Sequence, residues 1–511
     1  MSHRVSTGST NRTTSSTNRA TGSTYVAPLL ALALVGAACS VEAPDTTIER
    51  VATQDSAAAG PPAAGEVAPL DDPAYDASLS EPRQDPVYPS LGDGGLDALH
   101  YDLDLAWDPA GEVLSGREGV VLRATEDDDE LVLDLSDALT VEQVRLDGTE
   151  MTWRHEAQDL VVDADVVADQ RYRLDLTFSG TPRPVAAPTT RSDFSTNGWT
   201  ITDTGAVWTM QEPSGAHSWY AVNDQPADKA SYEITVEAPA PMRGVANGTL
   251  VEESESDGTT RMTWEMPQPT ASYLVTVAID DFVDVRTETA GGLPLSSWTP
   301  RSDRDLAVDL DLAEEGLAWL EERLGDYPFD TLGFLLVDSD SGMETQTMIT
   351  LGARSASYTT SGPVLVHEMA HHWWGDLVTP ETWRDLWMNE GMAMYLQAMW
   401  MASREPYSLD QLIAYWDADD GPLRTAAGPP ADYDPETFGE SNVYYVPAVM
   451  WHELRGRLGD DLFWRLVREW PQEHAYGNAG YDDIVAFFSE GAGEDLAPFF
   501  DGWLLGETRP S

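Results

Sequence analysis

Three residues on one predicted helix, His367, Glu368 and His371, could together bind and use a metal ion. Residues four positions apart share one face of an α-helix, so both imidazoles can point at the same ion. This HExxH spacing is typical of zinc peptidases, in which the two histidines are ligands and the glutamate takes a proton from water. Zinc lowers the pKa of its bound water to about 7, which makes that step feasible at neutral pH. The spacing therefore predicts metal-assisted hydrolysis.

A third ligand is expected at Glu390, which follows His371 after 18 residues and lies in a second helical stretch, Trp387 to Tyr395. Three protein ligands leave the open position that a catalytic zinc ion requires. The alternative is a chance pair of histidines on an amphipathic helix. We predict one Zn²⁺ per chain, bound by His367, His371 and Glu390.

Other residues near the predicted zinc ligands are expected to have structural roles. His372 points about 100° around the helix from His371, which favours packing or solvent contact. Trp373 and Trp374 are expected in the hydrophobic core. Trp374 and Leu377 also occupy the positions where a rival zinc pattern has glycine and a third histidine, so that pattern is absent.

HExxH and the glutamate inside LWMNEG, residues 386–391, resemble the aminopeptidase N family of zinc metallopeptidases, which belongs to the gluzincins. The resemblance extends from about Ala98 to the C-terminus. It implies a β domain followed by a thermolysin-like catalytic domain, in a short bacterial form that lacks the C-terminal helical domain of many relatives. It also implies peptides with a free N-terminus as substrates.

Two further segments resemble the parts of this family that hold the substrate's α-amino group. In SGMETQT, Gly342, Met343 and Glu344 match the Gly-x-Met-Glu-Asn motif, whose glutamate binds the amine. In TMQEP, Glu212 matches a second amine-binding carboxylate, and Gln211 lies one place after the family's glutamine. A carboxylate facing a positively charged amine is the physical reason for acids here. The resemblance implies that all five residues contact substrate.

The stretch from Asn442 to Gly459 resembles the family's Val-Tyr-x-Lys-Gly segment, whose tyrosine stabilises the tetrahedral oxyanion. Tyr444 matches that tyrosine, and Tyr445 is the competing candidate. A donor aimed at developing negative charge is worth about 3 kcal/mol in comparable sites. The predicted catalytic residues are therefore Glu368 and Tyr444.

Together these parts predict a zinc-dependent aminopeptidase that hydrolyses the N-terminal peptide bond, with Glu368 as general base. One alternative is an endopeptidase on the same site, since a short form would leave the site open. Others are a non-catalytic relative that binds peptides and a structural cell-surface protein. Hydrolysis of N-acetylated peptides would indicate an endopeptidase, and inactivity on a broad peptide panel would favour a binding module.

The elements that must position these residues fall into two classes. Alternating apolar residues recur from about Leu96 to Val285 and predict half-buried antiparallel strands. They occur at Tyr101 to Trp107, Tyr172 to Phe178, Tyr232 to Val236 and Tyr273 to Ile279. After about Trp298 the spacing becomes helical, first from Leu306 to Leu324, where Gly325 is placed to end the helix. A short strand, Phe334 to Val337, and further helices follow.

The predicted fold class is multi-domain α+β. An N-terminal antiparallel all-β domain is expected at 90–295, followed at 296–511 by a thermolysin-like, α-rich catalytic domain with a small sheet.

The N-terminal 39 residues read as a secretory signal. The arginines Arg4, Arg12 and Arg19 precede an apolar run, Val26 to Ala38, that is too short to span a membrane. Cys39 follows this run and resembles the acylated cysteine of bacterial lipoproteins. This implies an extracytoplasmic protein, anchored as a lipoprotein at the cell surface or in the periplasm, with plain secretion as the alternative. Residues 40–89, rich in Ala, Pro, Asp and Glu, are expected to form a disordered linker.

The charge excludes some classes of partner. With 88 acidic and 29 basic residues the formal net charge is −59, which repels nucleic acid and anionic membranes. Membrane contact is therefore expected only through a lipid anchor at Cys39, which is also the only cysteine and so excludes an internal disulfide. Salt adaptation and the codon bias of a GC-rich genome are the two alternative explanations of this acidity.

Overall fold

A computed structural model describes residues 69–510 of the chain. The expected signal peptide with Cys39, and residues 40–68 of the expected linker, lie outside the described residues. Among the helices of the described part, none combines the length and apolar character that a membrane span needs.

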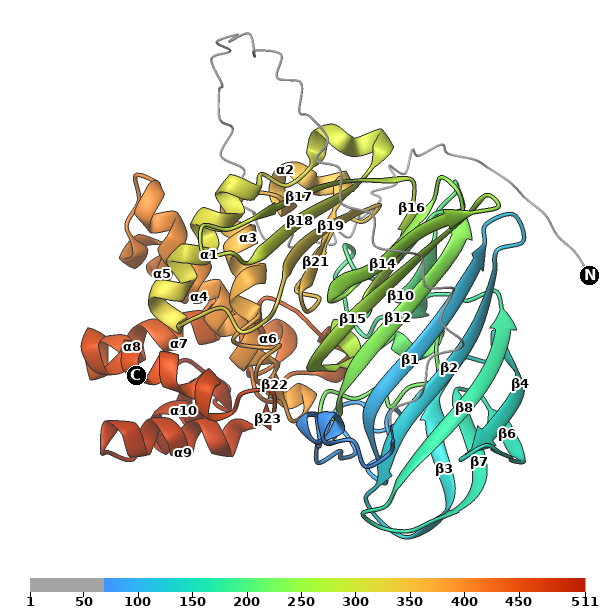
Figure 1. The fold of residues 1–511 in the computed structure, drawn as a ribbon. Coiled ribbons are helices and arrows are strands. Elements are labelled where there is room, and N and C mark those ends of the chain that lie inside the picture. The colour runs from blue at the N-terminus through green and yellow to red at the C-terminus, as the bar shows by residue number, and fades with distance from the viewer. Residues whose placement is uncertain (1–68, 511) are drawn as a thin grey trace, which may run out of the picture. The chain divides into compact units, whose positions relative to one another are not determined.

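Strands form the first half of the described chain, as the alternating apolar pattern predicts. The largest sheet has eight strands in the order β14-β15-β12-β1-β2-β8-β4-β5, and only the β1–β12 pair is parallel (Figure 1). In β1, Tyr101, Leu103, Leu105 and Trp107 are all buried, which confirms the expected inward face. The strands are β1 (Leu96–Asp108), β2 (Val113–Ala124), β4 (Leu139–Leu146), β5 (Thr149–Glu150), β8 (Arg171–Gly180), β12 (Lys229–Pro239), β14 (Thr249–Ser256) and β15 (Thr259–Ala271).

Two smaller sheets complete the β domain, in the orders β13-β16-β11-β10-β9 and β3-β7-β6. The pattern from Tyr273 to Ile279 is only partly a strand, because Ser272–Leu274 form a short 3-10 helix, η3, before β16 begins. Residues 272–279 are all buried, so their alternation does not mark one exposed face. The strands are β3 (Asp128–Asp134), β6 (Trp153–Glu156), β7 (Asp159–Val166), β9 (Val185–Ala186), β10 (Thr196–Ile201), β11 (Val207–Met210), β13 (Arg243–Ala246) and β16 (Val277–Asp280).

The sheet of the catalytic half begins earlier than residue 296. β17 (Phe282–Glu288) pairs with β18 (Pro294–Pro300), and the sheet continues through β19 (Leu332–Val337) and β21 (Met348–Gly352) to the edge strand β20 (Gly342–Met343). The boundary expected between 295 and 296 falls inside β18, whereas the sheet that contains β18 already includes β17 from Phe282 onward.

Helices form most of the catalytic half (Figure 1). The first one begins after its N-cap Asp309 and ends at Gly325, whose φ of 97° suits glycine, as the sequence predicts. Leu306 lies before this helix and is exposed. Helix α1 packs on α3, α3 on α4, and α4 on α7. The helices are α1 (Leu310–Leu324), α2 (Ala356–Thr359), α3 (Gly362–His371), α4 (Leu386–Arg404), α5 (Leu409–Asp417), α6 (Asp420–Ala427), α7 (Asn442–Leu458), α8 (Asp460–Glu473), α9 (Tyr481–Ala492) and α10 (Ala497–Leu504).

Residues 69–89 differ from the disordered linker expected for 40–89. A short 3-10 helix in this segment buries Tyr75, and Asp85 accepts a hydrogen bond from the backbone N–H of Trp383 at 2.7 Å. These contacts fix the segment to both halves of the molecule. Composition predicted disorder here because the few anchoring side chains form no periodic pattern.

The chain's single lysine, Lys229, also connects the two halves. It lies at the start of β12, is fully buried, and donates to the backbone oxygens of Asp376 at 2.7 Å and Leu377 at 3.3 Å. Burial lowers the pKa of Lys229 to about 7, although Asp376 opposes the shift. Lys229 thereby holds the turn that follows the predicted zinc helix.

Candidate active site

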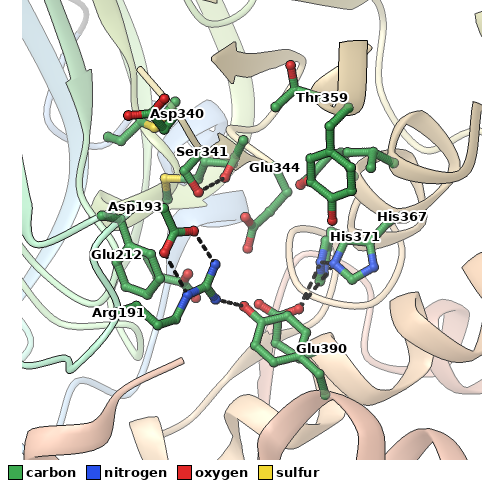
Figure 2. A pocket seen from close by; sticks show the side chains of 18 of the residues that line it. Arg191, Asp193, Glu212, Asp340, Ser341, Glu344, Thr359, His367, His371 and Glu390 are labelled. Carbon is green, nitrogen blue, oxygen red and sulfur yellow. Dashed lines mark hydrogen bonds and ion pairs between the residues drawn. The ribbon is translucent and has the colours of Figure 1, made fainter. Parts of the chain in front are cut away.

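The three predicted zinc ligands converge on one point. His367 and His371 project from the last turns of α3 and Glu390 from the first turns of α4. Glu390 Oε2 lies 3.2 Å from His367 Nε2 and 3.5 Å from His371 Nε2, and the two imidazole nitrogens are 3.2 Å apart (Figure 2). All three residues are buried. Two imidazole nitrogens and one carboxylate oxygen form the donor set of a catalytic zinc site, so the residues fit the metal.

The close crossing of α4 and α7 brings Tyr444 to this site. An added Cβ at Gly391 would lie only 2.5 Å from the Cβ of Pro447, so only glycine permits this approach of the two helices. Tyr444 lies one turn before Pro447, and its ring is stacked with the ring of His367, with the two ring centroids 6.2 Å apart. Tyr445 points elsewhere and stacks on Trp416 at 5.0 Å. Of the two candidate tyrosines, Tyr444 therefore lines the pocket.

Glu212 and Glu344, the two carboxylates predicted to bind the amine, line the same pocket, as do Gly342 and Met343 of the edge strand β20. Glu344 and Glu368 each place a carboxylate oxygen within 4.8 Å of a ring nitrogen of His371. Figure 2 shows Glu344 pointing into the pocket between the zinc ligands and Glu212. An added Cβ at Gly342 would lie 3.2 Å from Glu368 Oε1, so a larger residue would crowd that carboxylate.

The pocket concentrates acidic groups away from water. Burial is the largest cause that raises the pKa of Glu212 and of Glu344, and Glu390 raises both further. Burial also raises the pKa of Glu368, to about 8. For Glu390 burial acts in the same direction, but His371 and His367 outweigh it and hold the pKa below its usual range. Glu212 Oε1 and Glu344 Oε1 are buried and have no hydrogen-bond partner within residues 69–510.

Gln211 does not face the pocket, contrary to the substrate contact expected for it. Its side chain is fully buried, donates to the backbone oxygen of Ser272 at 2.7 Å and accepts from the indole N–H of Trp219 at 2.9 Å. Successive residues of extended chain point to opposite sides, so Met210 and Glu212 line the pocket while Gln211 points into the β domain.

The other residues of the zinc helix are structural, as expected. Trp373 and Trp374 are buried in the core of the catalytic half. His372 is also buried, and its Nδ1 lies 2.8 Å from the hydroxyl of Tyr327. The second ring nitrogen of the ligand His371 faces the backbone oxygen of Trp374 at 3.2 Å, a contact that holds the imidazole in place.

Sequence reasoning missed Arg191 and Asp193, which line the pocket from the opposite side to the zinc ligands (Figure 2). They come from the irregular segment between β9 and β10, and the Arg191 guanidinium contacts the hydroxyl of Tyr444 at 3.3 Å. No periodic pattern surrounds them. The only signal is a basic residue in a chain that has 88 acidic residues and 29 basic ones.

A buried ion pair stabilises the loop that carries Glu212. His217 Nδ1 lies 2.7 Å from Asp224 Oδ2, and Asp224 also accepts from the backbone N–H of Gly215 at 2.9 Å. Burial by itself would lower the pKa of His217, but Asp224 and Asp134 outweigh it and raise the pKa above its usual range. The two carboxylates therefore favour the charged form of the His217 imidazole inside this loop.

His217→Gln is expected to lower the free energy of unfolding by about 1–3 kcal/mol at pH 6 and by less at pH 9. Because the folded pKa of His217 lies above its unfolded value of about 6.5, its contribution is complete below pH 6.5. That contribution is lost as the pH rises through the folded value. Urea unfolding of the wild type and of His217→Gln at pH 6, 7.5 and 9 measures the difference in their free energies of unfolding.

His100→Gln is the matched control for this titration. Burial lowers the pKa of His100 to about 4, so this histidine stays neutral across the same pH range. The difference in free energy of unfolding between the wild type and His100→Gln should be constant from pH 6 to 9. If the free-energy difference between the wild type and His217→Gln is equally constant, or grows with pH, the proposed ion pair of protonated His217 with Asp224 would be contradicted.

Comparisons with known proteins agree with this architecture. The Peptidase M1 N-terminal domain model matches residues 97–274, and the Peptidase family M1 domain model matches residues 308–503. Aminopeptidase N of Streptomyces lividans is 25% identical over 446 residues, which cover 80% of this chain and 50% of that protein. Aminopeptidase 2 of Candida albicans is 24% identical over 443 residues, covering 79% of this chain and 46% of that protein. The chain thus spans about half the length of these curated relatives.

Solved structures share the fold over a larger part of their length. A two-domain M1 zinc metallopeptidase mutant bound to L-tryptophan gives a TM-score of 0.76 at 24% identity, covering 84% of this chain and 98% of that one. An M1 zinc metallopeptidase mutant from Deinococcus radiodurans, bound to a Tyr-Ser-Ala substrate, gives 0.74 at 23% identity with the same coverage. Since both M1 domain models match in order along one chain with this fold, the chain belongs to peptidase family M1, a family of zinc metallopeptidases.

Proposed function

We propose that this protein is a zinc-dependent aminopeptidase that hydrolyses the first peptide bond of peptides with a free N-terminus. One zinc ion per chain would be held by His367, His371 and Glu390. The proposal rests on two buried carboxylate oxygens, Glu212 Oε1 and Glu344 Oε1, which have no partner among the described residues. Buried negative charges are costly without a cation, and the protonated α-amine of a peptide is a cation of suitable size and chemistry.

The pocket residues have complementary roles in this proposal. Glu344 and Glu212 bind the amine, which places the first peptide bond beside the ligand triad. When bound, zinc supplies a Lewis acid for the peptide carbonyl and makes water more acidic. Glu368 accepts a proton from the attacking water and returns it to the leaving amine. The Tyr444 hydroxyl donates to the developing oxyanion.

Cleavage of Tyr-Ser-Ala and of its N-acetylated form by the zinc-loaded protein tests this function. Acetylation removes the positive charge that Glu212 and Glu344 bind, so we expect the free tripeptide to be cleaved at least about 100-fold faster. Removal of zinc with a chelator should abolish cleavage, and zinc should restore it. Equal cleavage of both peptides would indicate an endopeptidase, and cleavage of neither would contradict the proposal.

A further inference from the structure

A loop of the β domain, residues 187–195, reaches across to the segment that precedes helix α7. The backbone N–H of Phe438 donates to the Pro188 oxygen at 2.9 Å, and the Thr189 hydroxyl donates to the Phe438 oxygen at 2.7 Å. The Thr190 hydroxyl donates to the carboxylate of Glu440. These contacts hold the 187–195 loop against the start of the helix that carries Tyr444.

Arg191 extends from this loop to the hydroxyl of Tyr444. Its Nε and Nη2 donate to Asp193 at 3.2 and 2.5 Å, while Nη1 donates to the Gly439 oxygen at 2.9 Å and to the Tyr444 hydroxyl at 3.3 Å. The guanidinium carbon also lies 4.3 Å above the ring of Phe194. Because all these partners hold one planar group, its orientation toward Tyr444 is fixed.

The direction of the hydrogen bond between Arg191 and Tyr444 follows from the chemistry of the two groups. A guanidinium has only donors, so the phenol oxygen of Tyr444 accepts from Arg191. The phenol's own proton must then point elsewhere, and the carboxylate of Glu390, one of the three predicted zinc ligands in the same pocket, is its hydrogen-bond partner. In the proposed reaction the oxyanion develops in that pocket.

We propose that Arg191 is a positioning residue, which orients the Tyr444 hydroxyl so that its proton points at the developing oxyanion; this inference rests on the proposed aminopeptidase function. Direct binding of a substrate carboxylate by Arg191 is the competing role. It fits less well, because Asp193 already neutralises the guanidinium and most of its donors are engaged.

A double-mutant cycle with Arg191→Met and Tyr444→Phe, using Tyr-Ser-Ala as substrate, tests the inference. Arg191→Met should lower kcat by about 10- to 100-fold with KM changed less than about threefold, since the lost contact acts on the transition state. In the Tyr444→Phe background, Arg191→Met should lower kcat less than about threefold, because the hydroxyl that Arg191 orients is already absent. Zinc content should equal that of the wild type in every variant.

Thr190→Val is the matched control, because it removes a contact between the same loop and Glu440 without touching Tyr444. It should keep kcat within about threefold of the wild type. If Arg191→Met does not fold, Arg191→Lys replaces it, since a lysine keeps the positive charge beside Asp193 but has all its donors on one nitrogen and lacks the planar fork that contacts Asp193 and Tyr444 together. The same loss of kcat, again absent in the Tyr444→Phe background, is expected.

Three results with the Arg191 variants would overturn the inference. They are wild-type kcat in the Arg191 variants, losses that multiply fully with that of Tyr444→Phe, and a rise in KM alone, which would indicate direct substrate binding. A Thr190→Val loss as large as that of Arg191→Met would instead indicate general loosening of the loop and would also overturn it. Failure of the proposed function looks different, because the zinc-loaded wild type would then cleave neither peptide, or would cleave the free and the N-acetylated peptide equally.

Discussion

Replacing Glu368 by glutamine is expected to lower kcat for Tyr-Ser-Ala by about 10²- to 10⁴-fold while zinc content stays at the wild-type level. The space beside Gly342 is narrow, because a Cβ added to Gly342 would lie 3.2 Å from Glu368 Oε1. Glutamine has nearly the same shape as glutamate, so it fits in this space. It cannot accept a proton from water at neutral pH. Peptide cleavage rates and zinc per chain, measured on the same preparations, check the prediction.

His371→Gln is the matched control for this substitution. His371 belongs to the ligand triad, whereas Glu368 does not, so its replacement should remove zinc and activity together. Glu368→Gln that retains both zinc and activity within about threefold of the wild type would show that another group accepts the proton. Loss of zinc from Glu368→Gln would show that this glutamate belongs to the ligand set.

The zinc ligands could be predicted from sequence because the site is built from local helical geometry. Residues 367 and 371 share a face of any regular helix, and Glu390 opens the next long helix packed on the first. Strand patterns were equally informative where one face is buried and the other exposed, as in Tyr101 to Trp107. The pattern failed at Ser272–Leu274, where both sides of the backbone are buried.

Residues on irregular backbone were less predictable. Gln211 was expected near substrate from its neighbours in sequence, but in extended chain the adjacent positions 210 and 212 face the opposite side. Arg191 reaches Tyr444 across 253 positions of sequence, from a loop without any periodicity. Such a contact depends on how two domains meet, and no local spacing encodes that.

Glu344→Gln is the second change expected to have a large effect, with kcat/KM for Tyr-Ser-Ala falling by about 10- to 100-fold. The residue follows the edge strand β20, where its carboxylate is buried with one oxygen that has no partner among residues 69–510. A neutral amide keeps the shape but loses the charge that attracts the α-amine. Glu212→Gln should cause a loss in the same range, because Glu212 lines the same pocket and its Oε1 is likewise without a partner in the described part of the chain.

Asp340→Asn is the control for loss of a pocket carboxylate. Asp340 pairs with Arg354 at 3.2 Å at the exposed edge of the pocket, so its neutralisation should change kcat/KM less than about threefold.

The amine-anchor role also predicts how the two variants respond to the substrate's N-terminus. If Glu344 and Glu212 act by binding the charged amine, both variants should lose their rate on the free peptide and keep whatever slow rate they have on the acetylated one. The ratio of the two rates should therefore fall in each variant, and furthest when both glutamates are replaced. Equal losses on free and acetylated peptide would mean that these carboxylates support the zinc site and do not recognise the amine. That outcome would leave the hydrolytic chemistry of Glu368 intact but remove the basis for calling the protein an aminopeptidase.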